Sequence, residues 1–344
     1  MLYTPPTHMS TGGRLTAFDI AKGIGIILVI LGHSGIAGAK YIYSFHMPLF
    51  FIISGYFLSE RGTTKDYILK KAKQLMLPYA YGCLLSSLLI CLLFCFVDLP
   101  VSLSEVMGER MIAWCYGLGW YYDIPGSDIH IQMAGTFWFL PGLLFALSCV
   151  RIALQYKHSW VIVGLCAYVG YKTAHLFMLP MSLQAGLNAG VFVYLGHLAK
   201  KHDITHTPEY RSPWLLCAAL LTWFEAARTG WLGLSTCDYS SPLTNIITAT
   251  CMTYVVLRAS EFLDKIRGIG RFLSYIGAST LFIYCVHACS QAAILRFSPE
   301  YHIQLMSRGW VRAYLYITPF AALLIRAGLR RLATQRTRRQ EERS

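Results

Sequence analysis

Five ionisable side chains interrupt an otherwise apolar stretch between residues 18 and 57, namely Asp19, Lys22, His33, Lys40 and His46. Nearly every other residue of this stretch is apolar, aromatic or glycine. Such a composition is typical of a membrane interior, where an ionisable side chain is costly and marks a functional site by default. These side chains are therefore the first candidates for chemistry.

The spacing of Lys22 and His33 places both on one face of a helix. Eleven residues of separation return to within ~20° of the same direction, and Asp19 and Val29 fall on the same stripe. The imidazole then lies ~16 Å along the axis from the ammonium. A cation near the membrane surface can hold an anion, and an imidazole deeper on the same line can take up and return a proton.

Each candidate also has a structural interpretation. His33 is the predicted catalytic residue, although a single histidine in an apolar helix is often a packing residue. Two interpretations of Lys22 are even on the sequence alone. Oriented by Asp19, it binds the phosphates of a donor substrate, or it only pairs with Asp19 or reaches the interface. His46 and His287 are predicted to line a pocket, because His287 lies at a depth close to that of His33 and the three imidazoles then converge. Their alternative is a packing role.

Other residues are weaker candidates for the same pocket. Glu225 and Arg228 are three residues apart and form either a self-neutralising ion pair or a site for acceptor hydroxyls. Trp138 either packs in the bundle or faces a sugar. The segment 98–135 is rich in Trp, Tyr and Asp, which suits either a carbohydrate platform or the interfacial aromatic belt common in membrane proteins.

The composition indicates a membrane protein. Of 344 residues, 55% are hydrophobic and 14% charged, whereas a soluble domain carries about 25% charged residues. The net charge of +13 comes from short basic clusters between apolar runs, which is typical of topology signals beside anionic lipid and not of nucleic-acid binding. The eleven cysteines form no CxxC pair, so buried thiols are expected. A disulfide between Cys115 and Cys237 is left open.

We expect an all-α polytopic membrane protein. At about 20 apolar residues per crossing, ten helices are predicted, at roughly 16–36, 41–59, 77–97, 136–153, 159–179, 182–199, 213–230, 243–260, 272–295 and 310–330. Alternating loops then place 22 Lys and Arg residues on one side and seven on the other, which predicts that both termini are cytoplasmic. The expected parts are a polar lead at 1–15, a transmembrane domain at 16–330 and a basic tail at 331–344. No cleavable signal peptide is expected.

A series of motifs runs through the chain: D-x-x-K-x10-H with FHMPLFFIISGYF, then KKAKQLMLPY, TFWFLPGLLF, GVFVYLGHLAKK and YIGASTLFIYCVH. This series resembles the acyltransferase 3 family, multi-pass membrane proteins that acylate, most often O-acetylate, sugars and other cell-envelope polymers. The D-I-A-K-G sequence is similar to the branch of fucose 4-O-acetylases. Lys22 stands where other members have Arg, so it departs from the wider pattern and keeps the positive charge. The resemblance implies that His33 is catalytic and that the donor is an acyl-CoA.

The sequence and this resemblance predict an O-acyltransferase, most simply an O-acetyltransferase, of the cytoplasmic membrane. Acetyl-CoA or a longer acyl-CoA is the expected donor substrate, and a carbohydrate or other envelope molecule is the expected acceptor. Membrane lipid is a further partner; no nucleic acid, bound cofactor or metal is expected. His33 acts as general base or carries the acyl group transiently. The identity of the acceptor, the acyl chain and the oligomeric state are left open. No G-x-S-x-G elbow, Walker A or H-E-x-x-H motif is present.

Two other classes remain open from the sequence. A proton-coupled transporter or flippase would use His33, His46, His287 and Glu225 as a relay, although no repeat between the two halves of the chain is visible, as is common in transporters. A subunit for polymer export or partner binding, without catalysis, is the third class.

Overall fold

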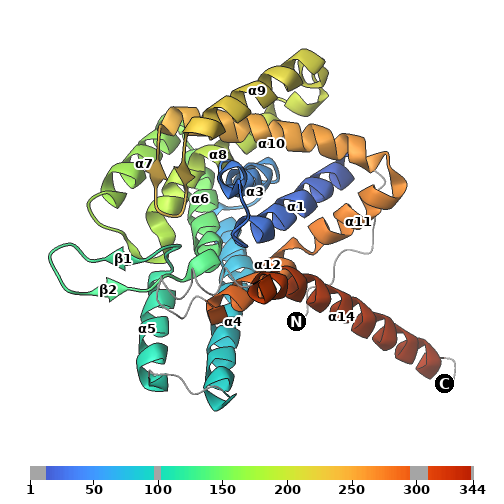
Figure 1. The fold of residues 1–344 in the computed structure, drawn as a ribbon. Helices are drawn as coiled ribbons and strands as arrows, with labels where there is room; N and C mark the ends of the chain where they lie inside the picture. Colours follow the sequence, from blue (N-terminus) through green and yellow to red (C-terminus); the bar gives the residue numbers. More distant parts are fainter. Residues whose placement is uncertain (1–12, 97–101, 295–308, 342–344) are drawn as a thin grey trace.

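The computed structural model describes residues 13–96, 102–294 and 309–341, and this part of the chain is predominantly helical, as predicted (Figure 1). The helices are α1 (Gly13–Gly32), α2 (Ala39–Tyr43), α3 (His46–Tyr56), α4 (Thr64–Phe96), α5 (Leu103–Tyr116), α6 (Phe139–Ala153), α7 (Ser159–Ala174), α8 (Leu183–Lys201), α9 (Pro213–Thr229), α10 (Pro242–Asp264), α11 (Arg267–Ala278), α12 (Thr280–Ile294) and α14 (Gly309–Glu341). Four short 3-10 turns are η1 (Gly135–Trp138), η2 (Pro180–Ser182), η3 (Ile204–His206) and η4 (Glu209–Arg211).

Two antiparallel hairpins of two-residue strands complete the described chain. Strand β1 (Tyr122–Asp123) pairs with β2 (His130–Ile131), and β3 (Leu232–Gly233) pairs with β4 (Asp238–Tyr239). Neither hairpin nor helix α5 is predicted from the sequence. All three lie in segments where aromatic and polar residues alternate irregularly, so the hydropathy pattern shows neither the period of a helix nor that of a strand.

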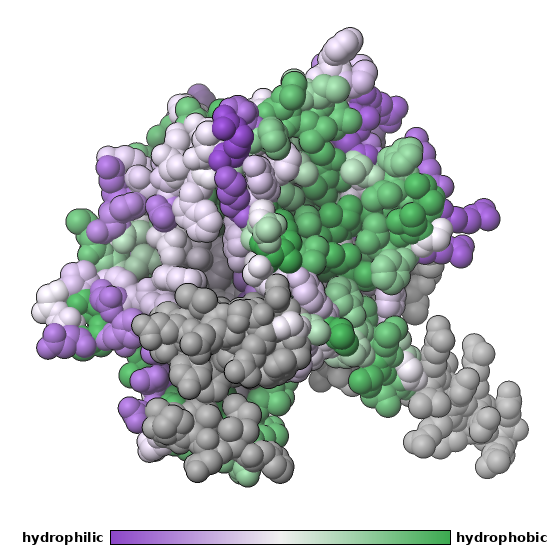
Figure 2. Space-filling model, viewed as in Figure 1, coloured by the Kyte–Doolittle hydropathy of each residue, from purple (hydrophilic) through white to green (hydrophobic). Residues whose placement is uncertain are grey.

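Among the residues that the structure describes, three helical segments are long and apolar enough to cross a membrane, at Thr64–Leu92, Gly135–Ala153 and Pro242–Asp264. A fourth is the pair Arg267–Ala278 and Thr280–Ala292, which is bent by 65°. An apolar surface covers α10 and α11 in Figure 2, and the exposed side chains on these helices include Phe262, Ile269 and Phe272. These features agree with a membrane protein; the predicted ten crossings and the orientation of the termini stay predictions.

Several helices break or end where the sequence analysis expects them to continue. The first ends at Gly32 and not at 36, because Gly35 and Gly38 adopt left-handed φ angles of 70° and 81°. The predicted helix at 41–59 is divided at Ser44–Phe45 into α2 and α3. The predicted helix at 272–295 is divided at Ser279 into α11 and α12. Hydropathy counts apolar residues and does not detect these bends.

Helices α3 and α8 pack backbone against backbone through glycine. A Cβ atom on Gly196 would lie 1.9 Å from the carbonyl oxygen of Ile52, and one on Gly55 would lie 1.9 Å from that of Val193. Helices α1 and α11 meet in the same way, since a Cβ on Gly277 would lie 1.7 Å from the carbonyl oxygen of Asp19. Small residues at helix contacts are the usual means of close approach in membranes, where burial of apolar area between helices gains little.

Replacing Gly196 by alanine is expected to force α3 and α8 apart and to lower the thermal unfolding midpoint by several degrees. Overpacked contacts of this kind cost about 1–3 kcal/mol. Gly164 in α7 is the matched control, because a Cβ there meets nothing within 4 Å; alanine at 164 is expected to leave stability unchanged or raise it by up to ~1 kcal/mol. Thermal unfolding of the two detergent-purified variants checks this, and equal midpoints would contradict it.

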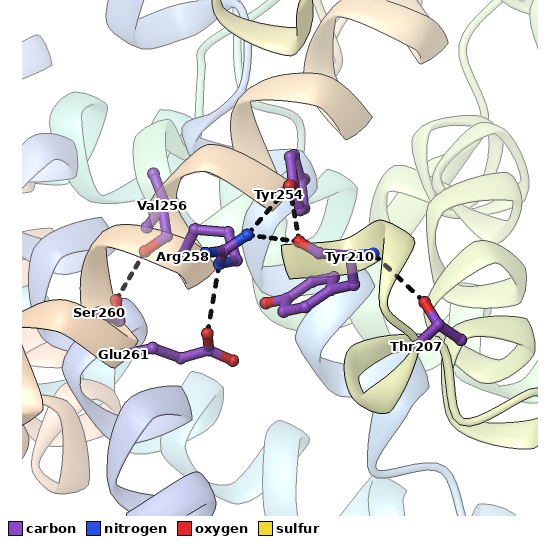
Figure 3. A network of polar contacts seen from close by, with 7 residues as sticks. All are labelled: Thr207, Tyr210, Tyr254, Val256, Arg258, Ser260 and Glu261. Carbon is purple, nitrogen blue, oxygen red and sulfur yellow. Dashed lines mark hydrogen bonds and ion pairs between the residues drawn. The ribbon is translucent and has the colours of Figure 1, made fainter. Parts of the chain in front are cut away.

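The connection between α8 and α9 is held to α10 by the polar network in Figure 3. The guanidinium of Arg258 donates to the carbonyl oxygen of Tyr210 and lies 3.3 Å from a carboxylate oxygen of Glu261. The hydroxyl of Tyr254 donates to the same carbonyl at 2.7 Å. The Arg258 guanidinium also stacks 5.3 Å from the centre of the Tyr210 ring. These contacts fix η4 against the middle of the bundle, near the start of α1.

Candidate active site

His33 lies just beyond the end of α1, half-buried, with its ring directed toward two other imidazoles. Its Nδ1 is 2.8 Å from the carbonyl oxygen of Val29. A carbonyl only accepts hydrogen bonds, so Nδ1 carries the proton in the neutral ring and Nε2 keeps a free lone pair.

His46 begins α3 and is almost completely buried, with 2% of its surface exposed. Its Nδ1 lies 2.8 Å from the carbonyl oxygen of Ile42, so its Nε2 is also the basic nitrogen. The ring centres of His46 and His33 are 6.3 Å apart. Two imidazoles with the same tautomer therefore face one another across the α1–α3 connection.

His287 in α12 completes the group. Its side chain is fully buried, and its ring centre is 5.5 Å from that of His33. Neither of its ring nitrogens has a hydrogen-bond partner within the described part of the chain. A buried polar atom without a partner costs about 1–3 kcal/mol, and such atoms in a native protein call for an explanation. The structure thus brings together the three histidines named from the sequence, which we call the histidine cluster (His33, His46 and His287).

Tyr43 is the member of the site that the sequence analysis missed. Its ring lies 5.8 Å from His33 and 5.1 Å from His46, and its hydroxyl is 3.3 Å from the carbonyl oxygen of Gly32. On its other side it meets the ring of Trp231 at 6.0 Å. Its position in the sequence offers no clear signal, because the chain breaks at Ser44–Phe45 and Tyr43 and His46 belong to different helices.

Lys22 and Asp19 lie toward the other end of α1 and form an ion pair of 2.7 Å, with about a third of each side chain exposed. The structure does not bring them into contact with the histidine cluster. Their pairing is the arrangement expected of an i,i+3 pair. An ammonium that is partly exposed remains accessible to an anionic ligand, so the predicted binding of the donor by Lys22 is still a proposal.

The remaining candidates lie outside the histidine cluster. Glu225 and Arg228 form an exposed ion pair of 2.5 Å on α9. Trp138 is 7% exposed and packs against Phe51 and Phe139, with ring distances of 6.4 and 6.3 Å. These positions agree with the packing and self-pairing interpretations of the three residues.

All eleven cysteines are free thiols, so Cys115 and Cys237 do not form the disulfide that the sequence left open. Cys237 is buried and its sulfur lies 3.4 Å from the amide nitrogen of Asn188. Among the residues that the structure describes, no set of three or more His, Cys, Asp or Glu side chains has the arrangement of a metal site.

The apolar helices are those of a membrane protein, and three histidines gather beside its first helix. A family model described as an acyltransferase domain matches residues 15–327, so the chain belongs to this family. This confirms the family indicated by the sequence motifs.

Two curated relatives have local similarity. The nodulation protein NolL of Mesorhizobium japonicum is 28% identical over 190 residues, which cover 50% of this chain and 45% of that protein. NolL of Sinorhizobium fredii is 26% identical over 187 residues, covering 49% of this chain and 45% of that protein. The match therefore spans less than half the length of each relative. No solved structure shows a significant match.

Proposed function

We propose that the chain transfers an acyl group, most simply acetyl, from an acyl-CoA to a hydroxyl of a cell-envelope carbohydrate. The observation that carries the proposal is the free Nε2 of His33, fixed by the bond from Nδ1 to Val29 and facing two further imidazoles. Membership of the acyltransferase family favours this reaction over the proton-coupled transport that buried histidines also suggest. The multi-pass arrangement in the cytoplasmic membrane, with both termini inside, is part of the proposal.

In this reaction, Nε2 of His33 takes the proton of the acceptor hydroxyl while the hydroxyl oxygen attacks the thioester carbon. The tetrahedral intermediate collapses, the C–S bond breaks, and the CoA thiolate receives the proton from the imidazolium. The products are the ester and free CoA. The neutral His46 ring can accept a hydrogen bond from the acceptor at Nε2, and the N–H of His287 can stabilise the developing oxyanion. Transient acylation of His33 itself is the alternative route.

The proposal is tested by incubating membranes that contain the chain with radiolabelled acetyl-CoA and envelope glycans. Label is expected to appear in the glycan fraction as alkali-labile ester, and not in membranes that lack the chain. Absence of transfer under conditions where CoA analogues bind would overturn the proposal. Movement of protons or solute across the membrane without acylation would favour the transporter instead.

Replacing Lys22 by methionine is expected to raise the KM for acetyl-CoA by roughly tenfold with little change in kcat, since a charge-assisted hydrogen bond contributes about 1.5–3 kcal/mol. Arginine at position 22 keeps the charge and is expected to retain most of the affinity. The double variant Asp19→Asn with Lys22→Met shows whether a higher KM comes from loss of the ammonium or from leaving the Asp19 carboxylate unpaired. Equal KM values for wild type and Lys22→Met would show that the ion pair is only structural.

A further inference from the structure

A pocket lies outside the histidine cluster, beside the two hairpins. It has a volume of about 210 Å³ and is lined by Trp120, Tyr121, Tyr122, Ser235 and Thr236, together with apolar side chains. Trp120 and Tyr121 come from the segment between α5 and β1, and Tyr122 is the first residue of β1. The two hydroxyl residues come from the turn between β3 and β4. Pockets for drug-sized ligands usually measure about 300–1,000 Å³, so this one suits a single small ring.

The lining combines aromatic faces with hydroxyl groups. Trp120 is 58% exposed and its ring meets that of Tyr121 at 5.7 Å. The hydroxyl of Tyr122 accepts a hydrogen bond of 3.0 Å from the backbone N–H of Met178, which holds this ring in place. Aromatic rings with polar edges present an apolar face and a polar tip to the same ligand. A pyranose has the matching surfaces, with C–H groups on its faces and hydroxyls at its rim.

Tyr121 provides a hydroxyl without a partner in the described part of the chain. Burial raises its pKa, although the nearby charge of Arg110 lowers it in part, so the phenol stays protonated and can donate. The ring of Tyr121 stacks on His130 at 5.6 Å, and His130 is hydrogen-bonded to Asp123 in the β1–β2 hairpin. Residues of an interfacial belt project toward lipid. The three aromatic rings instead line a pocket whose other side is formed by Ser235 and Thr236 of the β3–β4 hairpin.

One hairpin connects this pocket to the histidine cluster. Trp231, directly before β3, meets Tyr43, and Tyr43 in turn meets His33 and His46. The backbone N–H of Trp231 donates to the hydroxyl of Ser240 at 3.0 Å, beside the pairing of β3 with β4. Two successive ring contacts therefore separate His33 from the hairpin whose turn borders the pocket. A group held in the pocket is distant from a group that reacts at His33.

We propose that this pocket, the Trp120 pocket (Trp120, Tyr121, Tyr122, Ser235 and Thr236), binds a pyranose unit of the acceptor other than the unit that is acylated. The inference rests on the acyl transfer proposed above. Binding of a remote part of a substrate supplies energy that positions the reacting part. The enzyme therefore prefers acceptors of several sugar units to single sugars.

The test compares two kinds of acceptor in detergent-purified protein with radiolabelled acetyl-CoA. One is a set of glycan fragments of two to six units, released from the envelope of cells that lack the chain; the other is the methyl glycosides of their single units. For Trp120→Ala, the ratio of kcat/KM for fragments to kcat/KM for single units is expected to fall roughly tenfold, as for loss of one aromatic contact. Tyr121→Phe, which removes only the free hydroxyl, is expected to lower the same ratio by a few fold.

Trp214→Ala is the matched control, because Trp214 lies at the start of α9 with 82% of its surface exposed, outside the pocket. It is expected to leave the ratio unchanged. The inference is overturned if Trp120→Ala also leaves the ratio unchanged, or if it lowers kcat/KM for both kinds of acceptor equally.

Tryptophan fluorescence with the same fragments separates this inference from the proposed function. If fragments change the fluorescence of wild type and not of Trp120→Ala, while no acetyl is transferred, sugar binding in the Trp120 pocket is supported and the proposed reaction is contradicted. If wild type transfers acetyl to glycans with no preference for fragments over single units, the proposed reaction is supported and sugar binding in the Trp120 pocket is contradicted.

Discussion

Replacing His33 by glutamine is expected to lower kcat for acyl transfer by roughly a hundred- to ten-thousand-fold, the range for loss of a general base. Glutamine can still donate a hydrogen bond to the carbonyl of Val29, so the end of α1 is expected to keep its structure. It has no lone pair that can take a proton at neutral pH. The KM for acetyl-CoA is expected to change little, because the donor is proposed to bind toward the opposite end of α1.

The matched control is His175→Gln. His175 follows α7, is exposed, and has the same kind of bond, with Nδ1 2.7 Å from the carbonyl oxygen of Tyr171. Substitution there is expected to leave transfer unchanged. Steady-state assays with radiolabelled acetyl-CoA measure both variants, and full activity of His33→Gln would exclude His33 both as base and as acyl carrier.

The same assay without acceptor distinguishes the two routes. An acyl-imidazole is released by neutral hydroxylamine, so label that stays with wild-type protein and leaves on this treatment indicates transient acylation of His33. Direct transfer leaves the protein unlabelled in the absence of acceptor.

The second large effect is expected at His287, where activity and stability are predicted to change in opposite directions. Leucine at 287 removes a donor to the oxyanion and is expected to lower kcat by roughly a hundred- to a thousandfold. It also removes two buried nitrogens that have no partner within the described residues. The free energy of unfolding is therefore expected to stay unchanged or to rise by about 1–3 kcal/mol.

Gln184→Leu provides the contrast. Gln184 is also buried, but its side chain donates to the carbonyl of Phe177 at 2.8 Å and accepts from the N–H of Leu179 at 2.7 Å. Its replacement leaves both backbone groups unpaired and is expected to destabilise the protein. Thermal and denaturant unfolding compare the two variants. A His287→Leu protein as destabilised as Gln184→Leu would indicate that His287 is a structural residue.

The sequence predicts much of this site for one physical reason. Apolar segments make each ionisable side chain conspicuous, and equal depth in two segments places His33 and His287 at one level. Depth does not determine which helices are neighbours, however, so the direct contacts among the three rings emerge only in the structure. Tyr43 was missed because a tyrosine in an apolar segment has no charge to mark it.

The fold was less predictable where backbone geometry decides the outcome. The bend at Ser279 and the end of α1 at Gly32 leave no trace in hydropathy. Helix α5 was missed although its start has a recognisable signal, Ser102 followed by Glu105, with the Ser102 hydroxyl accepting from the N–H of Glu105 at 3.2 Å. The irregular pattern of the surrounding segment concealed a helix that capping chemistry alone indicates.

The break between α11 and α12 has a consequence for how the two substrates meet. Gly277, before the break, lies against Asp19 in the first half of α1, and His287, beyond it, reaches His33 at the far end. The bent segment α11–α12 thus contacts α1 at two points, one beside Asp19 and one at His33. Straightening the bend would remove one of the two contacts. In the proposed reaction, the thioester of the donor and the hydroxyl of the acceptor would then no longer be held close together.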